Sequence, residues 1–552
     1  QKTFEKVKVL NPRWSNPNKI LKDSKYLYQL NKKIIKNLYK KLNSINNTNH
    51  SEKFWYMLIS PWSFPFIQIV FDRWNSINSI IRQNKKKKFL TNTLNFKEKD
   101  KLTPLSTEEF LNFLRNDYWN QFLCQDIAKN FNNILITEKN FNLRDEYLTQ
   151  ENKKYSSFKF NFLKVLRNFF KIFSGKSNQY FIFKTYLGMW REFLLCLSLR
   201  QFPCFDEIKI KIKRKKINKK LRASLNKSIK TKGKFEKYLS RIFCDQFPLV
   251  FLEQFFDLQK FVNENYFLPN NPKKIFSSVC LWGNSAINYY CALKKEKKTK
   301  IIYVQHGGTY GITKTHFNTD YELEISDKFL SYGWKFDNKK ILKFGNIHNL
   351  KKKYSYSNKK RFLLFVSNKR HKYCTFLNSN SLWSIDFINT IKFYSNFLFD
   401  LPKNIKNNTL IRAMPNSNFS EVDFFKNLKT TFQVDSSKNI FNLYNNSKLI
   451  VHSINSTSML ETLHLNIPSI IILDKKHPFS NISKKIFMNL KKNNIFFDNP
   501  YIASRFVKKK WNKDIESWWY SVSVQNSINK FNLNFSKNRT NVVSDLKKIL
   551  IN

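Results

Sequence analysis

Glycine, acidic residues and paired cysteines are all scarce in this sequence. Only 9 of its 552 residues are glycine, and 39 acidic residues stand against 98 lysines and arginines. The seven cysteines form no C-x-x-C pair, which argues against a structural zinc site or a disulfide framework and favours a reducing compartment. We therefore expect a cytoplasmic protein.

Long uncharged runs are equally rare. No apolar segment follows a basic start, so no signal peptide is expected. Phe54–Phe71 carries no charge over 18 residues, but Pro61 and Pro65 interrupt it. With Ser60 as N-cap and Pro61 at the first helical position, the pattern predicts a buried helix that starts here and runs toward Arg82. A membrane span is the less favoured interpretation.

What is present indicates a folded, strongly basic protein. A hydrophobic content of 42% and an aromatic content of 16% exclude general disorder, and the length favours two or three domains. The net charge of +59 favours a polyanionic partner: nucleic acid, anionic lipid headgroups or phosphorylated small molecules. Lys, Asn, Ile, Phe and Tyr share A/T-rich codons, however, and the basic residues are spread along the chain, so we favour a compositional origin. The charge-dense section 209–237 is predicted to be an exposed loop or solvated helix.

The first half of the chain has helical periodicity. An amphipathic helix is predicted over Asp23–Leu42, where apolar residues recur at helical spacing. A second helix is predicted over Ser106–Phe131, opened by a capping box of Ser106 and Glu109.

The period changes near residue 275, where strands and helices begin to alternate. A strand, a helix and a second strand over Lys274–Val304 predict a β-α-β unit. A second series of strands follows. The sequence therefore predicts an α/β fold with two successive sheets, the second with strands near 361–370, 408–415, 448–453 and 468–473.

The strand "KIIYV" stops at a histidine and a cluster of glycines. His306, Gly307, Gly308 and Gly311 follow it closely, although glycine is rare elsewhere. Ligands of parallel sheets bind at carboxyl ends of strands, where a tight loop lets backbone N–H groups approach a charged group. The alternative is that the glycines only supply positive φ for a turn. His306 suits proton transfer or contact with a phosphate oxygen.

Three acids gather shortly after this loop: Glu322, Glu324 and Asp327. We interpret Glu324 or Asp327 as an alternative general base to His306. An equally good interpretation is that these acids cap a helix or strand.

The second predicted sheet has its own polar strand end. His452 and Ser453 end a strand, and Ser456, Thr457 and Ser458 lead into a predicted helix. Hydroxyl and free N–H groups at a helix N-terminus bind anions. Glu461, about one turn further, is within reach of a ribose hydroxyl. An ordinary N-cap explains one hydroxyl but not the cluster.

Basic residues end the neighbouring strands of this sheet. Lys369 and Arg370 follow one strand, and Arg412 lies within the next. Such residues bind a diphosphate or nucleotide phosphate and stabilise a leaving group. Arg412, inside an apolar strand, is the best candidate, since most lysines of so basic a chain are solvated.

These segments together resemble a bacterial family of transferases of surface-carbohydrate biosynthesis. The resemblance spans about residues 54–475 and is most specific in "QHGGTYG" and "ISDKFLSYGW". More distantly the chain is similar to GT-B glycosyltransferases that use CMP-activated acidic sugars. Family members carry an Arg-x-Tyr-Pro-His type sequence where this chain has Arg412 and, four positions later, Asn416. This departure bears on which donor is used.

The resemblance implies a GT-B-like α/β fold of two Rossmann-like domains with a large helical N-terminal portion. We expect an N-terminal acceptor-side domain over 1–348, its sheet starting near 274, and a nucleotide-sugar-binding domain over 349–500. C-terminal helices over 501–552 would cross back to the first domain. The implied activity is metal-independent glycosyl transfer, without a cofactor, from a nucleotide-activated donor to a surface polysaccharide or lipid-linked glycan.

Two other functions stay open. Transfer of a polyol phosphate from a CDP-polyol, as in teichoic-acid polymerases, would use a similar two-domain sheet and histidine-glycine loops. A non-enzymatic nucleic-acid-binding protein would explain the charge, but no known nucleic-acid-binding motif is apparent, so no nucleic acid is expected as partner. For localisation, contact with the anionic inner face of the cytoplasmic membrane is the alternative to a purely cytoplasmic protein.

Overall fold

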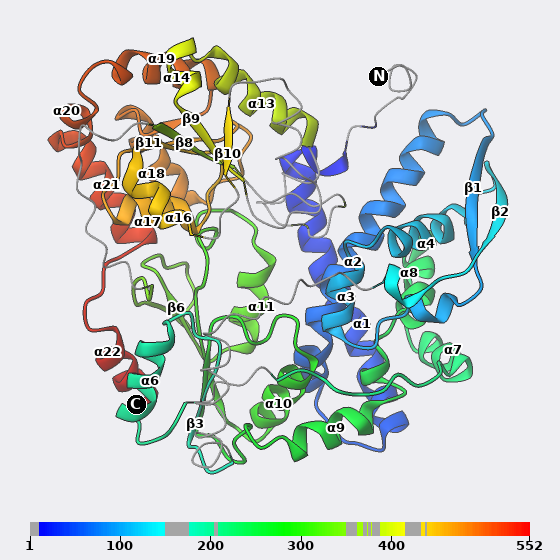
Figure 1. Cartoon of the computed structure of the whole chain (residues 1–552). Coiled ribbons are helices and arrows are strands. Elements are labelled where there is room, and N and C mark those ends of the chain that lie inside the picture. Colours follow the sequence, from blue (N-terminus) through cyan, green and yellow to red (C-terminus); the bar gives the residue numbers. More distant parts are fainter. Residues whose placement is uncertain are drawn as a thin grey trace. The chain divides into compact units, whose positions relative to one another are not determined.

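The computed structural model describes residues 10, 12–148, 176–203, 208–348, 362–367, 373, 377, 387–413, 432–435 and 439–552. The chain forms two compact units (Figure 1). Unit 1 comprises Gln1–Thr185, Glu192–Ile301 and Tyr373–Leu377, and unit 2 comprises Tyr186–Arg191, Ile302–Lys372 and Asn378–Asn552.

Unit 1 is built on two long paired helices. The predicted amphipathic helix is confirmed as α1, which is longer than predicted, and its apolar stripe is buried. α2 is buried over most of its length between α1 and the helices that follow. The described helices of unit 1, with its 3₁₀ turns, are η1 Arg13–Ser15, α1 Pro17–Asn46, α2 Glu52–Gln83, η2 Lys99–Leu102, α3 Thr107–Phe113, α4 Asp117–Ala128, η3 Asp145–Tyr147, α6 Met189–Ser198 (which begins in unit 2), α7 Lys219–Lys227, α8 Gly233–Asp245, η4 Leu249–Phe251, α9 Phe255–Glu264 and α10 Ser285–Glu296.

The predicted start of the buried helix that runs toward Arg82 was wrong. α2 begins at Glu52, because Ser51 is the N-cap and its side chain accepts from the backbone N–H of Phe54. Ser60 does not cap a helix, since its hydroxyl accepts a 3.1 Å hydrogen bond from the side-chain amide of Asn31. Both prolines lie inside the continuous helix. By length and composition α2 could cross a membrane, but its most apolar window is 100% buried inside the protein, as in a core helix, so this is weak evidence for a span.

The predicted helix over Ser106–Phe131 is two helices. α3 ends at Phe113, and Asn116 caps α4 by accepting from the backbone N–H groups of Tyr118 and Trp119. The capping box is only half formed. Ser106 accepts from the N–H of Glu109, but the Glu109 carboxylate accepts from the N–H of Leu105 instead of Ser106.

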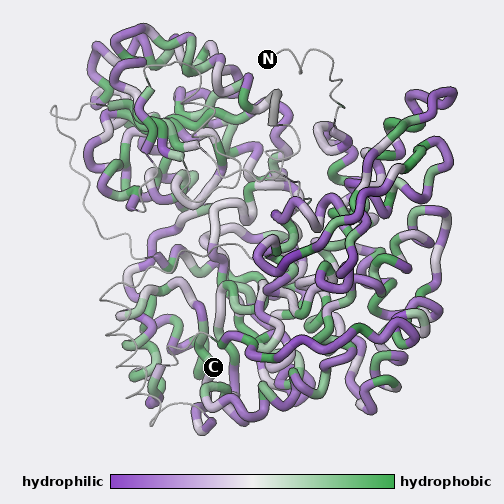
Figure 2. Tube along the Cα trace, turned by 45° about the vertical axis from the view of Figure 1, so that its right-hand side comes forward, coloured by the Kyte–Doolittle hydropathy of each residue, from purple (hydrophilic) through white to green (hydrophobic). Residues whose placement is uncertain are grey.

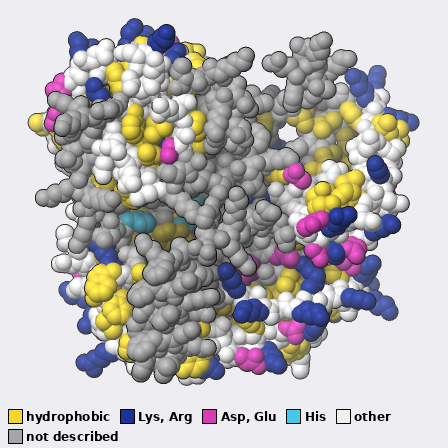
Figure 3. Space-filling model, in the orientation of Figure 1, with side chains coloured by type: hydrophobic (Ala, Val, Ile, Leu, Met, Phe, Trp, Pro, Cys, Tyr) yellow, Lys and Arg dark blue, Asp and Glu magenta, His cyan; other side chains and the backbone are white. Residues whose placement is uncertain are grey.

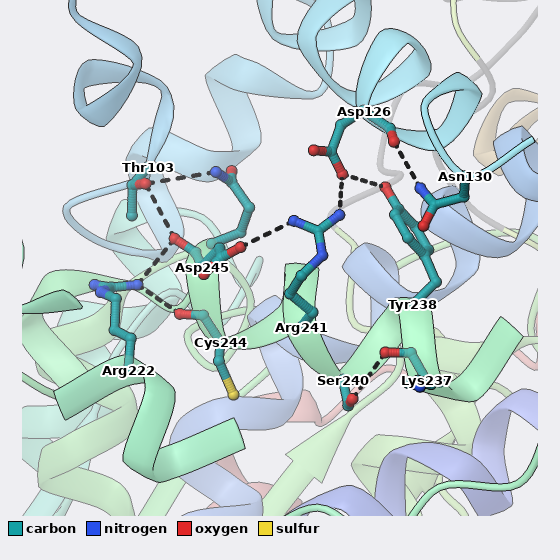
Figure 4. Close-up of polar contacts among 11 residues, drawn as sticks. Thr103, Asp126, Asn130, Arg222, Lys237, Tyr238, Ser240, Arg241, Cys244 and Asp245 are labelled. Atoms are coloured by element: carbon teal, nitrogen blue, oxygen red, sulfur yellow. Dashed lines mark hydrogen bonds and ion pairs between the residues drawn. The ribbon is translucent and has the colours of Figure 1, made fainter. Parts of the chain in front are cut away.

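A polar network joins α4 to α8 (Figure 4). The Asp126 carboxylate accepts hydrogen bonds from Arg241 (2.6 Å) and from the hydroxyl of Tyr238 (3.0 Å). Arg241 also reaches Asp245, one turn along α8. The predicted exposed section 209–237 has mostly exposed lysines and forms α7 and the start of α8.

The first parallel sheet has the strand order β3-β4-β5-β6-β7, and the predicted β-α-β unit is confirmed as β4, α10 and β5. Asn284 caps α10 by accepting from the backbone N–H of Ile287. β3, β6 and β7 were not predicted from the sequence. The strands are β3 Tyr180–Ile182, β4 Lys274–Ser277, β5 Lys300–Val304, β6 Lys328–Ser331 and β7 Ile341–Lys343.

The second sheet lies in unit 2 and has the order β10-β9-β8-β11-β12-β13, with every neighbouring pair parallel. Its central strands are apolar, as the green tubes of Figure 2 show, and the four predicted strands are confirmed. The strands are β8 Phe362–Val366, β9 Thr409–Arg412, β10 Gln433–Asp435, β11 Ser447–His452, β12 Ser469–Ile472 and β13 Phe496–Phe497.

The chain after the second sheet returns to the strand ends of the first. The backbone N–H of Lys537 donates to the carbonyl of Tyr332 (2.8 Å), and Ser536 accepts from the side chain of Asn346. The helices of unit 2 among the described residues are α11 Phe317–Ile325, α13 Phe387–Asp400, α14 Lys403–Asn407, α16 Ile440–Asn446, α17 Thr457–His464, α18 Asn481–Lys492, α19 Pro500–Trp511, α20 Ile515–Trp519, α21 Val522–Phe535 and α22 Val542–Ile551.

The α/β part of the predicted fold class is confirmed, since two parallel sheets follow a large helical part. The GT-B-like arrangement stays a prediction. The predicted domain boundaries after residues 348 and 500 stay a prediction. Of the described residues, β1 Phe89–Phe96 and β2 Ile134–Phe141 form a further, separate parallel pair in unit 1.

Candidate functional site

A buried glutamine fixes the loop that follows β5. The side-chain oxygen of Gln305 accepts from the backbone N–H of Tyr332 (2.9 Å) and from the indole N–H of Trp334 (2.7 Å). Its amide nitrogen donates to the carbonyl of Gly307. Gln305 thus ties the loop to the turn after β6 and holds His306 between fixed neighbours. No role was predicted for Gln305 from the sequence.

Two of the three glycines in this loop are required by close packing. A Cβ on Gly308 would lie 2.3 Å from the carbonyl carbon and oxygen of Ser456. Gly311 has φ +74° and packs on the ring of Trp334, where a Cβ would lie 2.4 Å from the nearest ring carbon. Positive φ therefore explains Gly311 alone. A Cβ on Gly307 would meet only ordinary contacts, at 3.8 Å and beyond.

His306 is hydrogen bonded to a buried tyrosine that contacts a carboxylate. The Tyr310 hydroxyl lies 3.0 Å from Nδ1 of His306 and 3.4 Å from Nε2, and it donates to Glu322 at 3.0 Å from each carboxylate oxygen. Glu322 is fully buried, and its Oε1 is 3.9 Å from Nδ1 of His306. Burial and the charge of Glu322 raise the pKa of Tyr310 well above its usual value, so the phenol keeps its proton.

This arrangement selects one tautomer of His306. A phenol has a single proton and a carboxylate can only accept, so Tyr310 donates to Glu322 and accepts from Nδ1–H, its nearer contact on His306. Nε2 is then the unprotonated nitrogen, which is the form that a general base requires. Glu324 and Asp327, and not Glu322, were predicted as bases, because strand and helix boundaries alone do not say which acid turns inward.

The two selected acids lie elsewhere on this segment. Glu324 is exposed on α11, and Asp327 is half-buried between α11 and β6. Glu322, by contrast, reaches His306 through the hydroxyl of Tyr310.

Further aromatic and histidine rings surround His306. The ring of Tyr186 stacks on that of His306, with centroids 6.0 Å apart, and also contacts His348. The rings of Tyr332 and His348 are 5.9 Å apart. The Tyr332 hydroxyl and Nε2 of His348 are buried and have no hydrogen-bond partner among the described residues. Burial lowers the pKa of His348 to about 4, so its ring is neutral at physiological pH.

The hydroxyl-rich start of α17 lies directly against the histidine-glycine loop. Gly308 packs on Ser456, and a Cβ on Gly307 would lie 4.0 Å from the Thr457 hydroxyl. Ser456 occupies the N-cap position but makes no side-chain capping bond; its hydroxyl instead contacts that of Ser458 at 2.6 Å. An ordinary N-cap therefore does not explain this cluster. The first-turn N–H groups of α17 receive no capping side chain from Ser456 and can bind an anion.

Glu461 is the half-buried acid of this cluster. Tyr444 donates to its carboxylate at 3.1 Å. Burial raises the pKa of Glu461 to about 7, and the hydrogen bond from Tyr444 opposes this shift. Burial is the largest cause that raises the pKa of Tyr332, followed by the charge of Tyr186 and then by the charge of Glu461. Glu461 therefore lies close enough to the His306 surroundings to act on them electrostatically.

Arg412 is the described basic residue of this cluster. It is 6% exposed, donates to the carbonyl of Ala413 (2.8 Å) and lies 3.5 Å from Asp435. Burial lowers the pKa of Arg412, and the charge of Asp435 partly offsets this. The positive charge of Arg412 in turn lowers the pKa of Tyr444, the partner of Glu461. Lys369, Arg370 and Asn416 lie outside the described residues.

The strand-end residues before α17 have internal partners. His452 is buried, and its Nε2 contacts the Thr462 hydroxyl at 2.7 Å; burial lowers its pKa to about 3. The Ser453 hydroxyl donates to the carbonyl of Val366. The neighbouring Asn455 is 1% exposed, and neither amide atom has a partner among the described residues. Such an unpaired buried amide is costly and rare.

Within the described part of the chain, no three His, Cys, Asp or Glu side chains are grouped so that they could hold a metal ion. Metal independence stays a prediction.

The comparisons with known proteins identify a family. The model of the LIC12162 family transferases matches residues 1–550, so the chain belongs to this family. No protein of curated function matches the sequence. The solved structures with similarity include the spinosyn rhamnosyltransferase SpnG with spinosyn aglycone (9% identity, 54% of this chain and 77% of SpnG, TM-score 0.30). They also include MurG of Acinetobacter baumannii (5% identity, 54% of this chain and 78% of MurG, TM-score 0.31). A third is the wall teichoic acid polymerase TagF (11% identity, 52% of this chain and 72% of TagF, TM-score 0.28).

Proposed function

We propose that this LIC12162 family transferase is a glycosyltransferase that moves a sugar from a nucleotide-activated donor, CMP-linked in our first hypothesis, to a hydroxyl of a surface glycan. Membership of a transferase family supports the general class of reaction. The observation that carries the proposal is the His306–Tyr310–Glu322 hydrogen-bond chain lying beside the uncapped N-terminus of α17.

In this proposal His306 is the general base. The acceptor hydroxyl gives its proton to Nε2 as its oxygen attacks the anomeric carbon, and the bond from that carbon to the donor phosphate breaks with both electrons left on the nucleotide. Glu322 stabilises the positive charge that develops on His306, acting through Tyr310. Glu322 and Tyr310 are thus positioning residues, in the manner of the acid of a catalytic triad.

The start of α17 would receive the nucleotide phosphate. The first-turn N–H groups, with the hydroxyls of Ser456, Thr457 and Ser458, would bind its oxygens, and the positive end of the helix dipole stabilises the departing charge. The positive charge of Arg412, which lowers the pKa of Tyr444, would add to the positive potential at the start of α17. Glu461 would accept a hydrogen bond from a ribose hydroxyl when ionised.

A thermal-shift screen tests the donor. The purified protein is heated with CMP, CDP, UMP, UDP, GDP or dTDP, and we expect CMP to raise the melting temperature most, because a ligand stabilises the state that binds it. Stabilisation by none of the nucleotides contradicts the proposal. Stabilisation by CDP with turnover of CDP-glycerol, and none of CMP-sugars, would instead favour polyol-phosphate transfer.

The role of His306 is tested by turnover with the best donor. His306→Ala should abolish turnover with the melting temperature little changed. The matched control is His464→Gln at the other end of α17, where the histidine contacts the carbonyl of Ser536. Wild-type turnover of His306→Ala removes His306 from the mechanism.

A further inference from the structure

An apolar pocket opens in unit 1, within a single unit and among residues that the proposed chemistry does not use. Its volume is about 320 Å³, and it is bounded by α2, α4, β1 and β2. Acidic, basic and histidine side chains are absent from its lining, which suits a hydrocarbon better than a charged substrate. The main apolar residues of the lining are Ile77, Ile80, Ile81, Phe89, Leu90 and Ile134.

The walls of this pocket are held by specific bonds. The Gln125 side chain forms two hydrogen bonds to the backbone of Leu94, so β1 is fixed to α4 (3.0 and 2.7 Å). Asp126, the next residue of α4, is held by Arg241 and Tyr238 of α8 (Figure 4). The pocket is therefore part of the packed structure of unit 1.

The β1–β2 pair leaves apolar side chains uncovered. Parallel strands are normally covered on both faces, but one face of the β1–β2 pair is exposed. Leu90 and Leu135 are directly opposite each other in register and are 72% and 50% exposed. Leu90 also lines the pocket. An exposed apolar patch that continues into an apolar pocket is typical of an interaction surface.

Positive charge lies at the end of this pocket. Lys85, Lys86, Lys87 and Lys88 are exposed in the segment that joins α2 to β1, two walls of the pocket. None of the four is in an ion pair with any described residue. Glu138 of β2 is paired with Lys129 at 2.6 Å. Figure 3 shows hydrophobic and basic side chains next to each other over this end of unit 1, at the upper right.

We propose that this surface, formed by Lys85–Lys88, Leu90, Leu135 and the pocket, docks unit 1 on an anionic phospholipid bilayer. Clustered lysines bind the headgroups, the two leucines insert, and an acyl chain enters the pocket. Charge alone would also fit nucleic acid, but a phosphate backbone would leave the leucines and the pocket unfilled. A bilayer supplies negative charge and hydrocarbon together. The inference does not depend on the proposed glycosyl transfer.

Vesicle flotation of the full chain tests this inference. We expect binding to phosphatidylcholine vesicles that contain phosphatidylglycerol and not to phosphatidylcholine alone, with binding weakened by salt. Changing Lys85, Lys86, Lys87 and Lys88 together to Gln should lower the partition coefficient at least about tenfold. Leu90→Ser with Leu135→Ser should lower it by a similar factor, because the inserted apolar area is lost.

A charge-matched control separates a specific surface from general basicity. Lys227, Lys230, Lys234 and Lys237 are also exposed in unit 1, and changing these four to Gln removes the same charge. This control should bind vesicles within about twofold of wild type. An equal loss in both quadruple variants overturns the proposal, as does binding that ignores phosphatidylglycerol. Circular dichroism melts confirm that each variant is folded.

The pocket itself is tested by cross-linking. Phosphatidylglycerol with a diazirine at the end of one acyl chain should label peptides of α2 and β1 that line the pocket, and labelling should disappear in the Lys85–Lys88 variant. Labelling confined to other parts of the chain, or binding to duplex RNA with no binding to vesicles, contradicts a lipid-docking surface.

Discussion

Gly308 lies so close to Ser456 that a Cβ on the glycine would be 2.3 Å from the serine carbonyl. These residues belong to the ends of different sheets, β5 of the first and β11 of the second, and are 148 positions apart. Their contact brings the histidine-glycine loop and the start of α17 together. We propose that the two segments form one donor site.

Gly308→Ala should disturb this contact, because backbone atoms cannot give way as a flexible side chain can. We expect a cost of about 1–3 kcal/mol, seen as a lower melting temperature, together with loss of nucleotide binding. Gly307→Ala is the matched control, since its Cβ would make only ordinary contacts, and its stability should stay within about 0.5 kcal/mol of wild type. Equal melting temperatures for both variants would mean that Gly308 is not packed on Ser456.

Tyr310→Phe should slow turnover at least about tenfold, since it breaks the link that sets the tautomer of His306. Glu322→Gln should have a comparable effect. The double variant should be little worse than the worse single variant, because both act through the same chain of bonds. Steady-state kinetics over a range of pH would measure this.

The control for Tyr310→Phe is Tyr290→Phe, which removes a buried hydroxyl that donates to the carbonyl of Pro269 (2.7 Å). This variant loses a hydrogen bond of similar burial without touching His306, so only its stability should change. Additive losses in the Tyr310 and Glu322 double variant would argue against a relay.

Ser456→Ala should not cost the stability that loss of an N-cap costs, because Ser456 makes no side-chain capping bond. Its effect should appear in nucleotide binding, as a smaller thermal shift. Asn499→Ala provides the contrast in unit 2, since Asn499 caps α19 by accepting from the N–H groups of Tyr501 and Ile502. That variant should lose about 1 kcal/mol and keep the full nucleotide shift. If Ser456→Ala instead lost about 1 kcal/mol of stability and kept the full nucleotide shift, Ser456 would be an ordinary N-cap.

We expect Glu461 to make donor binding dependent on pH. Its pKa is raised to about 7 by burial, so the ionised form that accepts from a ribose hydroxyl becomes dominant only above that value. We expect nucleotide affinity to increase from pH 6 to pH 8 in titration calorimetry, and Glu461→Gln to remove this increase. An unchanged pH profile in Glu461→Gln would exclude the residue from donor binding.

The Glu461 carboxyl also makes folding stability depend on pH. Here the stabilisation decreases as the pH rises, whereas nucleotide affinity increases. The folded state holds the proton of Glu461 more tightly than the unfolded state, whose carboxyl has the ordinary value of 4.5. The stabilisation is therefore fully present below pH 4.5 and is lost as the pH rises through about 7. Glu461→Gln should flatten this part of the melting-temperature profile, measured without nucleotide.

Much of the fold could be predicted from the sequence, because buried parallel strands are continuous apolar runs. The strands around Ile302, Leu364, Ile450 and Ile471 were found for this reason. Short strands such as β7, with two exposed residues of three, give no such signal. The start of α2 was mispredicted because Ser60 and Pro61 look like a helix start, and only the tertiary contact with Asn31 shows that they are internal.

The candidate site was predictable in part. His306 and the serines before α17 could be found because local sequence places them at strand and helix ends. Glu322 was not selected over Glu324, because their different burial depends on how α11 packs. Gln305 and Tyr332 act through contacts between distant segments, which no local pattern reveals.

Amide hydrogen exchange with and without nucleotide tests whether the two segments form one donor site. The ligand is the nucleotide that gives the largest thermal shift, and exchange is followed in peptides covering 303–312 and 453–461. We predict that both peptides become protected together, and that Gly308→Ala reduces protection in both. Protection of only one peptide, or of neither, at saturating nucleotide would contradict a single donor site formed by these two segments.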